Sequence, residues 1–403
     1  MAIAVKGSRR RHDGDFRTPA KDPVLPTARR HPLNLAALRL LHLLVLAAGL
    51  VAASGAWAFG FDDVVALAKG QAARAYSRPA VALPASLRQL NYDQYRDIRF
   101  KPARATWRRD GLPFELAFFH LGKHHTTPVR IHEVTPAGVR AIPFDPTDFD
   151  YGRNPAPKAA DGTLGFAGFR VHAALNRADY KDELIVFLGG SYFRALGRDQ
   201  IHGLSGRGLA LDTVGGRGEE FPQFTSFWVH RPAPDAKALV VHALLDSPRA
   251  SGAYEFTVRP GAETVIDVRS RLFLREGVTT LGIAPLTSMF QHGENQPRPG
   301  DFRPEVHDSD GLMVATGEGE WLWRPLVNPK QPLVTSFRTR DPKGFGLMQR
   351  DRAFASYEDA EAAYERRPST WVEPAGAWGA GCARVMPSCQ IACALRSTVI
   401  QES

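Results

Sequence analysis

Short apolar stretches, many of them alternating with polar residues, recur along the chain from about residue 98 onward. Alternation with a period of two is typical of strands that bury one face. Turn residues such as Pro260 and Gly261 interrupt these stretches every 8–15 positions. This spacing predicts an all-β fold, a large antiparallel β-sandwich. The predicted strands are FELAFFHLG (114–122), RIHEVT (130–135), LIVFLGGSYFRAL (184–196), ALVVHALLD (238–246), YEFTVRP (254–260) and TVIDVRSRLFL (264–274).

Two stretches follow a helical pattern instead. Residues 59–76, FGFDDVVALAKGQAARAY, place apolar side chains at helical spacing, which predicts one amphipathic helix. Residues 357–366, YEDAEAAYER, are rich in Ala and Glu and predict a second, short helix.

The first 58 residues form a predicted export signal with a long basic lead. The lead ends at Arg39, an apolar run covers Leu40–Ser54, and Ala56-Trp57-Ala58 matches an A-x-A cleavage site. The apolar run has 15 residues, whereas a transmembrane helix needs about 20. We therefore expect a cleaved signal, of the Sec type, and no stable membrane anchor; a retained anchor is the alternative.

Composition and charge narrow the class of protein. The 36 Gly and 30 Pro residues exceed the usual share and favour many short strands joined by turns. Residues 1–58 hold nine Lys or Arg and three Asp, which accounts for +6 of the net charge of +9. The remaining basic residues are scattered among acids, so a nucleic-acid partner is unsupported.

Cysteine usage fits an exported protein that folds without disulfides. All three cysteines lie in the last 22 residues, and the preceding 381 residues contain none. Their spacing does not form a metal or redox motif. The thirteen histidines also lack ligand spacing, so we expect no metal and no other cofactor.

The densest group of chemically active side chains lies between Gly282 and Arg324. Several prolines exclude a helix there, so the sequence predicts a loop between ordered flanks. Carboxylates accept hydrogen bonds from sugar hydroxyls, and an indole ring covers the apolar face of a sugar, which favours a sugar site. The alternative is a solvated acidic loop beside two core tryptophans. The group contains His292, Glu294, Asp301, Glu305, His307, Asp308, Asp310, Trp321 and Trp323.

Over about residues 59–381, long motifs resemble the periplasmic glucan biosynthesis proteins of Gram-negative bacteria, of the G and D types, with the G type the closer match. The motifs are LGFAGFR (164–170), SYFRALG (191–197), GLSGRGLALDT (203–213), GEEFPQF (218–224), ALLDSPRASGAY (243–254), APLTSMF (284–290), NQP (295–297), RPEVHDSDGL (303–312), GEWLWRPL (319–326), GFGLMQR (344–350) and RPSTWVEP (367–374).

The resemblance implies a galactose-mutarotase-like β-sandwich with a cleft, followed by a smaller immunoglobulin-like domain. It implies a periplasmic role in making osmoregulated periplasmic glucans. Partners would be β-1,2-glucan and inner-membrane glucan synthesis proteins. Similar family members include inverting endo-β-1,2-glucanases whose general base is the Asp of an HD motif, which matches Asp308.

The resemblance ends near Gly381, and residues 382–403 contain no Asp and only Glu402. The family's general acid is expected in an acidic segment beyond this point, so the acid and the immunoglobulin-like domain are both expected to be missing. We expect a glucan-binding sandwich over 59–381 and an unstructured tail over 382–403. Two functions stay open: a hydrolase that has lost its acid, and a lectin-like carrier that presents nascent glucan to other enzymes.

Other residues of these motifs are candidates for sugar contact. Arg donates several hydrogen bonds in a fixed geometry, and Tyr offers a flat face and a hydroxyl. For these the alternative is a core aromatic residue beside a structural ion pair, and for Asp308 it is a turn-capping role. His307 is expected to orient Asp308 or tune its pKa, and Glu305 and Asp310 are second candidates for the base. The predicted sugar-binding residues are Tyr192, Arg194, Arg207, Glu305, His307, Asp310, Trp321 and Arg324.

Overall fold

The computed structural model describes residues 59–77, 83–155, 164–215, 217–331, 333–386 and 390–395, with the backbone alone over 380–395. These residues belong to one unit of the chain. The predicted export signal, residues 1–58, lies outside them. In the part of the chain that is described, no helix has the length and apolar character that a membrane crossing requires.

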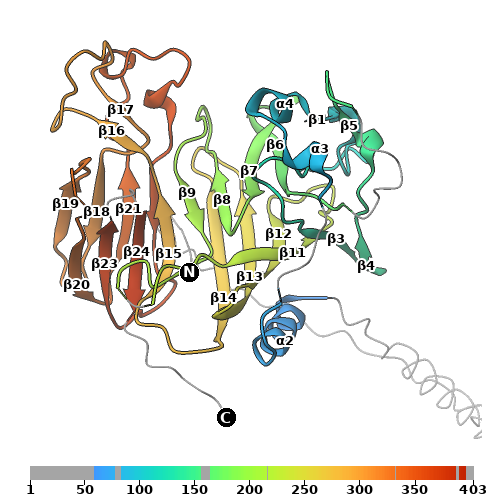
Figure 1. Cartoon of the computed structure of the whole chain (residues 1–403), viewed down its shortest axis with the longest axis horizontal. Helices are drawn as coiled ribbons and strands as arrows, with labels where there is room; N and C mark the ends of the chain where they lie inside the picture. The colour runs from blue at the N-terminus through green and yellow to red at the C-terminus, as the bar shows by residue number, and fades with distance from the viewer. Residues whose placement is uncertain are drawn as a thin grey trace, which may run out of the picture. The chain divides into compact units, whose positions relative to one another are not determined.

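The predicted all-β fold is confirmed: most of the regular secondary structure consists of strands in antiparallel sheets (Figure 1). The largest sheet has ten strands in the order β2-β6-β7-β8-β9-β15-β24-β23-β20, with β10 paired to β15. Its strands are β2 (Phe114–Phe119), β6 (Gly168–Arg177), β7 (Tyr180–Leu188), β8 (Tyr192–Ala195), β9 (Ser205–Arg207), β10 (Leu209–Leu211), β15 (Leu281–Thr287), β20 (Thr335–Arg340), β23 (Ala380–Met386) and β24 (Gln390–Leu395).

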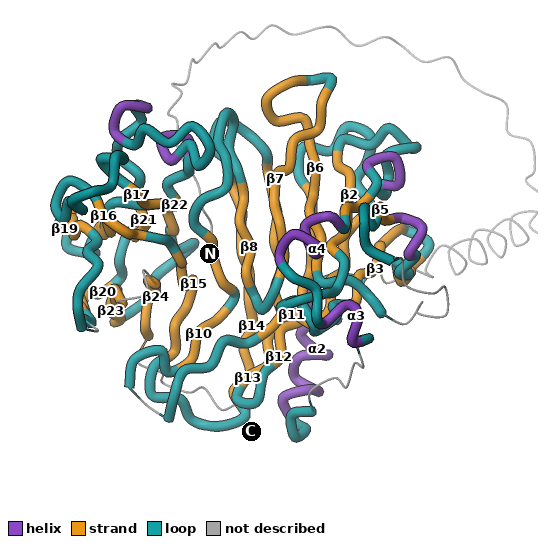
Figure 2. Tube along the Cα trace, turned by 45° about the horizontal axis from the view of Figure 1, so that its top comes forward, coloured by secondary structure: helices purple, strands orange, loops and turns teal. Residues whose placement is uncertain are grey.

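Smaller sheets complete the described fold (Figure 2). The six-stranded sheet is antiparallel except for the parallel pair β11–β3. Its order is β14 (Val265–Leu274), β13 (Ala250–Arg259), β12 (Leu239–Asp246), β11 (Gln223–His230), β3 (Arg130–Thr135), β4 (Gly138–Ala141). A four-stranded sheet has the order β19 (Trp321–Pro325), β18 (Gly311–Ala315), β21 (Gly344–Met348), β22 (Thr370–Val372). The two-stranded sheets are β1 (Arg99–Phe100) with β5 (Phe149–Asp150), and β16 (Phe290–His292) with β17 (Val306–His307).

Two hydrophobic cores hold these sheets together. In the larger core, Phe187 of β7 packs against Phe256 of β13, with ring centroids 5.2 Å apart, so the ten-stranded and six-stranded sheets form the sandwich. In the second core, Leu286 of β15 packs with Leu312 of β18 and Leu347 of β21. Each fully buried side chain of this size contributes about 1.5–3 kcal/mol. Strand β15 therefore belongs to the ten-stranded sheet of the first core and also contributes Leu286 to the second core.

The predicted amphipathic helix is confirmed as α2 (Phe61–Ala72). It packs on β12, β13 and β14, and its buried residues Phe61, Val64 and Ala68 meet Trp228 of the six-stranded sheet. Two shorter helices, α3 (Ala85–Arg88) and α4 (Tyr92–Asp97), follow.

The predicted helix over residues 357–366 is wrong. The segment forms turns that end in a 3-10 helix, Tyr364–Arg366. The side chain of Asp359 accepts a hydrogen bond from the backbone amide of Ala362, and Ala363 adopts a left-handed conformation with φ of 42°. Both features interrupt an α-helix, so local hydrogen bonding overrides the helical composition.

The expectation of an unstructured tail is wrong for the described part of residues 382–403. Strand β24 pairs with β15 and with β23, and β23 pairs with β20. A strand without a partner on one side presents unpaired backbone N–H and C=O groups, which accept another strand with little regard for its side chains. Residues 387–389 and 396–403 lie outside the described chain.

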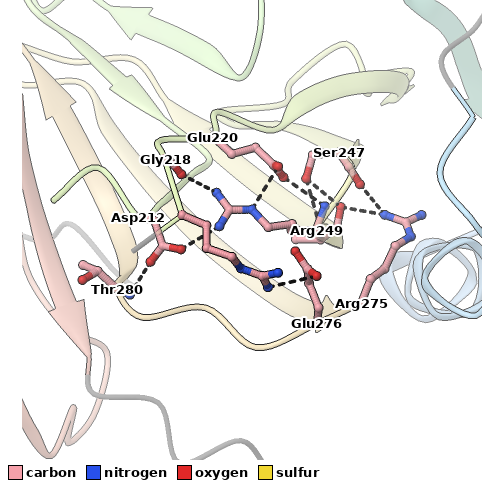
Figure 3. Close-up of polar contacts among 10 residues, drawn as sticks. Asp212, Gly218, Glu220, Ser247, Arg249, Arg275, Glu276 and Thr280 are labelled. Atoms are coloured by element: carbon pink, nitrogen blue, oxygen red, sulfur yellow. Dashed lines mark hydrogen bonds and ion pairs between the residues drawn. The ribbon is translucent and has the colours of Figure 1, made fainter. Parts of the chain in front are cut away.

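A buried polar network joins the turn between β12 and β13 to segments near β10 and β15 (Figure 3). Arg249, which is 8% exposed, donates to Asp212 at 2.6 Å and to Glu220 at 3.1 Å. The backbone amide of Thr280 donates to the other oxygen of Asp212 at 2.7 Å. Burial alone would raise the pKa of Asp212, but the Thr280 amide and the Arg249 guanidinium hold that pKa below its ordinary value.

We expect Arg249→Met to lower the free energy of unfolding by about 3–5 kcal/mol, because it leaves buried carboxylates without a cation. The matched control is Arg217→Met, whose partner Glu276 lies at 3.0 Å with side chains 70% and 41% exposed. An exposed pair of this kind contributes less than about 1 kcal/mol. Urea unfolding at neutral pH measures both variants, and equal losses would contradict the structural role of Arg249.

Candidate functional site

The predicted catalytic segment lies between β17 and β18 and is buried. All residues from Glu305 to Asp310 are buried, which rules out a solvated acidic loop. The backbone amide of Asp308 donates to the carbonyl of Met289 at 2.8 Å, and that of Asp310 donates to the carbonyl of Met348 at 2.9 Å. The end of β15 and the end of β21 therefore hold this segment from two sides.

Asp308 pairs with an arginine that lies far along the chain. Its side chain accepts a hydrogen bond from Arg367 Nη1, and the Arg367 guanidinium lies 4.1 Å from the centre of the Tyr364 ring. Burial raises the pKa of Asp308 above its ordinary value of 3.8, although the nearby charges of Arg367 and His307 oppose the shift. A carboxyl group whose pKa moves toward neutrality is better suited to take a proton than an ordinary surface Asp.

His307 is held at both ring nitrogens. Its Nδ1 lies 2.8 Å from Gln349 Oε1, and its Nε2 lies 2.7 Å from Glu305 Oε2. Gln349 Nε2 donates to the carbonyl of His307, which fixes Gln349 Oε1 as an acceptor toward the ring. Nδ1 therefore donates to Gln349, and the contact at Nε2 holds the ring against Glu305.

Asp310 connects this segment to the tryptophans of β19. Arg350 Nε donates to Asp310 Oδ2 at 2.7 Å, and the Arg350 guanidinium lies 4.8 Å from the Trp323 ring centre. The Trp323 ring lies directly on Gly311, where an added Cβ would overlap it. A glycine at this position therefore allows the ring to lie flat on strand β18.

Trp321 and Trp323 lie on one face of β19, as the period of two predicts, because they stand opposite Ala315 and Met313. Trp321 is 64% exposed and is not a core residue. Its ring stacks on Trp371 of β22, with centroids 5.6 Å apart. The two rings form an aromatic surface that is open to solvent.

Arg324 does not join this surface. It stands one residue after Trp323, so it lies on the opposite face of β19. Its guanidinium lies 5.0 Å from the ring centre of Phe337 in β20. The structure therefore separates Arg324 from Trp321, the other predicted sugar-binding residue of β19.

Tyr192 and Arg207 stand opposite each other on β8 and β9. The Arg207 guanidinium lies 4.0 Å from the Tyr192 ring centre and 4.0 Å from that of Phe221. Arg207 Nε donates to Thr287 Oγ1 at 3.2 Å. Arg194 lies two residues after Tyr192 on the same face of β8.

The end of β15 brings the Arg207 group and the Asp308 group together. Arg207 bonds to Thr287, and two residues later the carbonyl of Met289 accepts from Asp308. Gly203, before β9, also packs against Arg367, since an added Cβ would lie 3.0 Å from Arg367 Cβ. Residues more than 100 positions apart thus meet in one region of the described chain.

The sequence of the chain matches a known family. A family model described as "Periplasmic glucan biosynthesis protein, MdoG" matches residues 59–387. The chain belongs to the periplasmic glucan biosynthesis protein family. This confirms the resemblance drawn from the motifs, and the match continues slightly past the point where the motifs end.

Named relatives support the same assignment to the periplasmic glucan biosynthesis family. Glucans biosynthesis protein G of Ralstonia nicotianae is 59% identical over 340 residues, which cover 83% of this chain and 68% of that protein. The protein of the same name from Pseudomonas putida is 52% identical and that from Pseudomonas entomophila 48% identical. The matches cover 83% and 90% of this chain, and 60% and 62% of those proteins, so the chain spans about three fifths of their length.

Four residues that contact the Asp308 segment or Trp321 were absent from the sequence-based set. They lie in the family motifs GFGLMQR and RPSTWVEP, well after Asp308 in the sequence. These motifs were the available signal, but only the pairing of β18 with β21 and of β21 with β22 shows which residues they meet. The four residues are Gln349, Arg350, Arg367 and Trp371.

One group of carboxylates in the described chain has the spacing of metal ligands. Oxygen atoms of Glu294, Glu305 and Asp351 lie within 4.8 Å of one another. Arg350 lies 3.9 Å from Glu294 and supplies a positive charge beside the group. Clustered acidic residues alone do not define a metal site, so we assign no ion to them.

The raised pKa of Asp308 predicts a measurable pH dependence of stability. The folded protein binds a proton at Asp308 more tightly than the unfolded chain, so this group stabilises the fold most below pH 3.8. That contribution is lost as the pH rises through the window between 3.8 and the higher folded pKa. We expect the unfolding free energy of wild type minus that of Asp308→Asn to fall as the pH rises through this window.

The control for this measurement is Asp301→Asn, because Asp301 has the opposite shift. Hydrogen bonds from the side chain and backbone of Arg303 hold the pKa of Asp301 well below its ordinary value. The corresponding difference should fall as the pH drops below 3.8. Urea unfolding from about pH 3 to pH 7 measures both series, and a difference for Asp308→Asn that stays flat would contradict the assigned shift.

Proposed function

We propose that this protein acts in periplasmic glucan biosynthesis by binding β-1,2-glucan in the region of Asp308. Its relatives of 48–59% identity are named glucans biosynthesis protein G, which supports the biosynthetic role. The family description supports a periplasmic location. The predicted signal over residues 1–58 would bring the protein there, where inner-membrane glucan synthesis proteins would be its partners.

The observation that carries the proposal is the pair of the buried Asp308 and the half-buried Arg367, set among polar and aromatic side chains. Arg207 with Tyr192 lies toward one side of it along β15, and Trp323 with Arg350 connects to it through Asp310. Sugar sites use this combination, because carboxylates and guanidinium groups bind hydroxyls while rings cover C–H surfaces.

In a hydrolytic role, Asp308 would act as the general base of an inverting reaction. The base activates a water molecule on the face of the sugar opposite the leaving oxygen, and a separate acid protonates that oxygen. The raised pKa of Asp308 suits the base, and His307 would hold the segment in place through Glu305 and Gln349.

A second function, a carrier that binds nascent glucan without cleaving it, is favoured by the same ion pair. Asp308 is 8% exposed and Arg367 occupies one of its oxygens, which restricts its access to a water molecule. Trp321, stacked on Trp371 and open to solvent, suits binding without chemistry. The two functions differ in whether Asp308 contributes to cleavage.

The test compares Asp308→Asn with the wild-type chain, using linear β-1,2-glucan. We expect affinity to change by less than about tenfold. Where the wild-type chain releases new reducing ends, that release should fall by about 10²–10⁴-fold in Asp308→Asn, because a proton-transfer partner is lost. Asp179→Asn is the matched control, since Asp179 lies in an exposed pair with Arg177 at the turn between β6 and β7.

The outcomes separate the two functions. Binding without any release of reducing ends by the wild-type chain, unchanged in Asp308→Asn, would favour the carrier. Cleavage that survives in Asp308→Asn would move the base to Glu305 or Asp310. A wild-type chain that does not bind β-1,2-glucan at all would overturn the proposed ligand.

A further inference from the structure

Arg207 is a buried cation whose environment differs from that of the other deeply buried arginine. Both Arg207 and Arg249 are 8% exposed. Arg249 forms ion pairs with Asp212 and Glu220. Arg207 forms no ion pair with any carboxylate in the described chain, and its side-chain hydrogen bond goes to the neutral Thr287. The two arginines are equally buried, but only the charge of Arg249 is balanced by carboxylates, and this difference requires an explanation.

The neighbours of Arg207 fix its plane without neutralising its charge. The guanidinium is stacked between Tyr192 and Phe221, with 4.0 Å to each ring centre. Burial lowers the pKa of Arg207 to about 10, and the negative charge of the exposed Glu219 only partly offsets this effect. Two rings and one hydrogen bond at Nε hold the group in position, which leaves the two Nη groups as oriented donors.

The strand face around Arg207 adds a second guanidinium group. Arg194 lies on this face and forms no ion pair within the described chain. Ser205 and Thr287, which stand opposite each other on β9 and β15, are also on it. The face therefore combines two guanidinium groups with hydroxyl groups, a set that donates hydrogen bonds to negatively charged oxygen atoms.

We propose that Arg207 anchors a binding site for an oxyanion group of a ligand, a carboxylate or a phosphate ester. The paired Nη groups would donate to two oxygens of the anion, and Arg194 on the same face would add charge. The bound anion supplies the missing counter-charge, which explains why the chain buries Arg207 between two rings. This site does not depend on cleavage by Asp308 and can be tested with small anions alone.

The experiment follows the side-chain nitrogen resonances of Arg207 in the full chain during titration at constant ionic strength. Methyl phosphate and acetate are the two probes, and chloride is the reference anion. We expect one or both probes to shift the Arg207 resonances in a saturable way. The probe that binds more tightly distinguishes a phosphate ester from a carboxylate as the natural group.

Variants test whether the guanidinium itself is responsible. We expect Arg207→Met to weaken binding of the preferred probe by about tenfold or more, since it removes a charge-assisted bidentate contact. Arg207→Lys keeps the charge but loses the planar pair of donors, so we expect an intermediate loss. Arg177→Met, at an exposed pair with Asp179, is the matched control and should bind as the wild type does.

Arg207 resonances that do not respond to either probe would overturn the proposal. The proposal would also be overturned if the wild type, Arg207→Lys and Arg207→Met all bound the probe with the same affinity. The anion would then bind elsewhere on the surface. If Arg207→Met fails to fold, the wild-type titration and Arg207→Lys still decide the outcome, since both retain a cation between the rings.

Discussion

The constraint on which this structure depends is that each charge buried by the sheets requires a partner. Arg249 is compensated by Asp212 and Glu220, so the turn between β12 and β13 is joined to the segment between β10 and β11. Asp308 is compensated by Arg367, and its pKa still rises because burial outweighs that one cation. The first arrangement is fully paired and structural, whereas the second leaves a carboxyl group poised for proton transfer.

Strand β15 positions the polar residues of the candidate site. It belongs to the ten-stranded sheet and carries the second core through Leu286, so both of its ends are held by packing. Thr287 at its end binds Arg207, and Met289, two residues beyond that end, binds Asp308. The polar groups are therefore attached to a strand that cannot move without disturbing two cores, which keeps their geometry defined before any ligand arrives.

Predictions from composition failed where specific hydrogen bonds opposed them. The composition of residues 357–366 favours a helix, but Asp359 binds the amide of Ala362 and a left-handed Ala363 ends the turn. Residues beyond Gly381 lack the earlier pattern, yet β23 and β24 form because the backbone groups of neighbouring strands accept them. In both cases the backbone conformation is set by particular hydrogen bonds, and the amino-acid composition of the segment does not show which groups will form them.

The sequence alone predicted six strand-forming segments, the helix α2, the all-β class and the family, because period-two burial and long motifs are local properties of the chain. It also singled out Asp308 and Arg207. Only the tertiary structure decided that Arg367 pairs with Asp308, that Trp321 is exposed on Trp371, and that Arg207 has no carboxylate partner in the described chain. These facts depend on which strands become neighbours, and pairing between distant segments is set by the global packing of both cores.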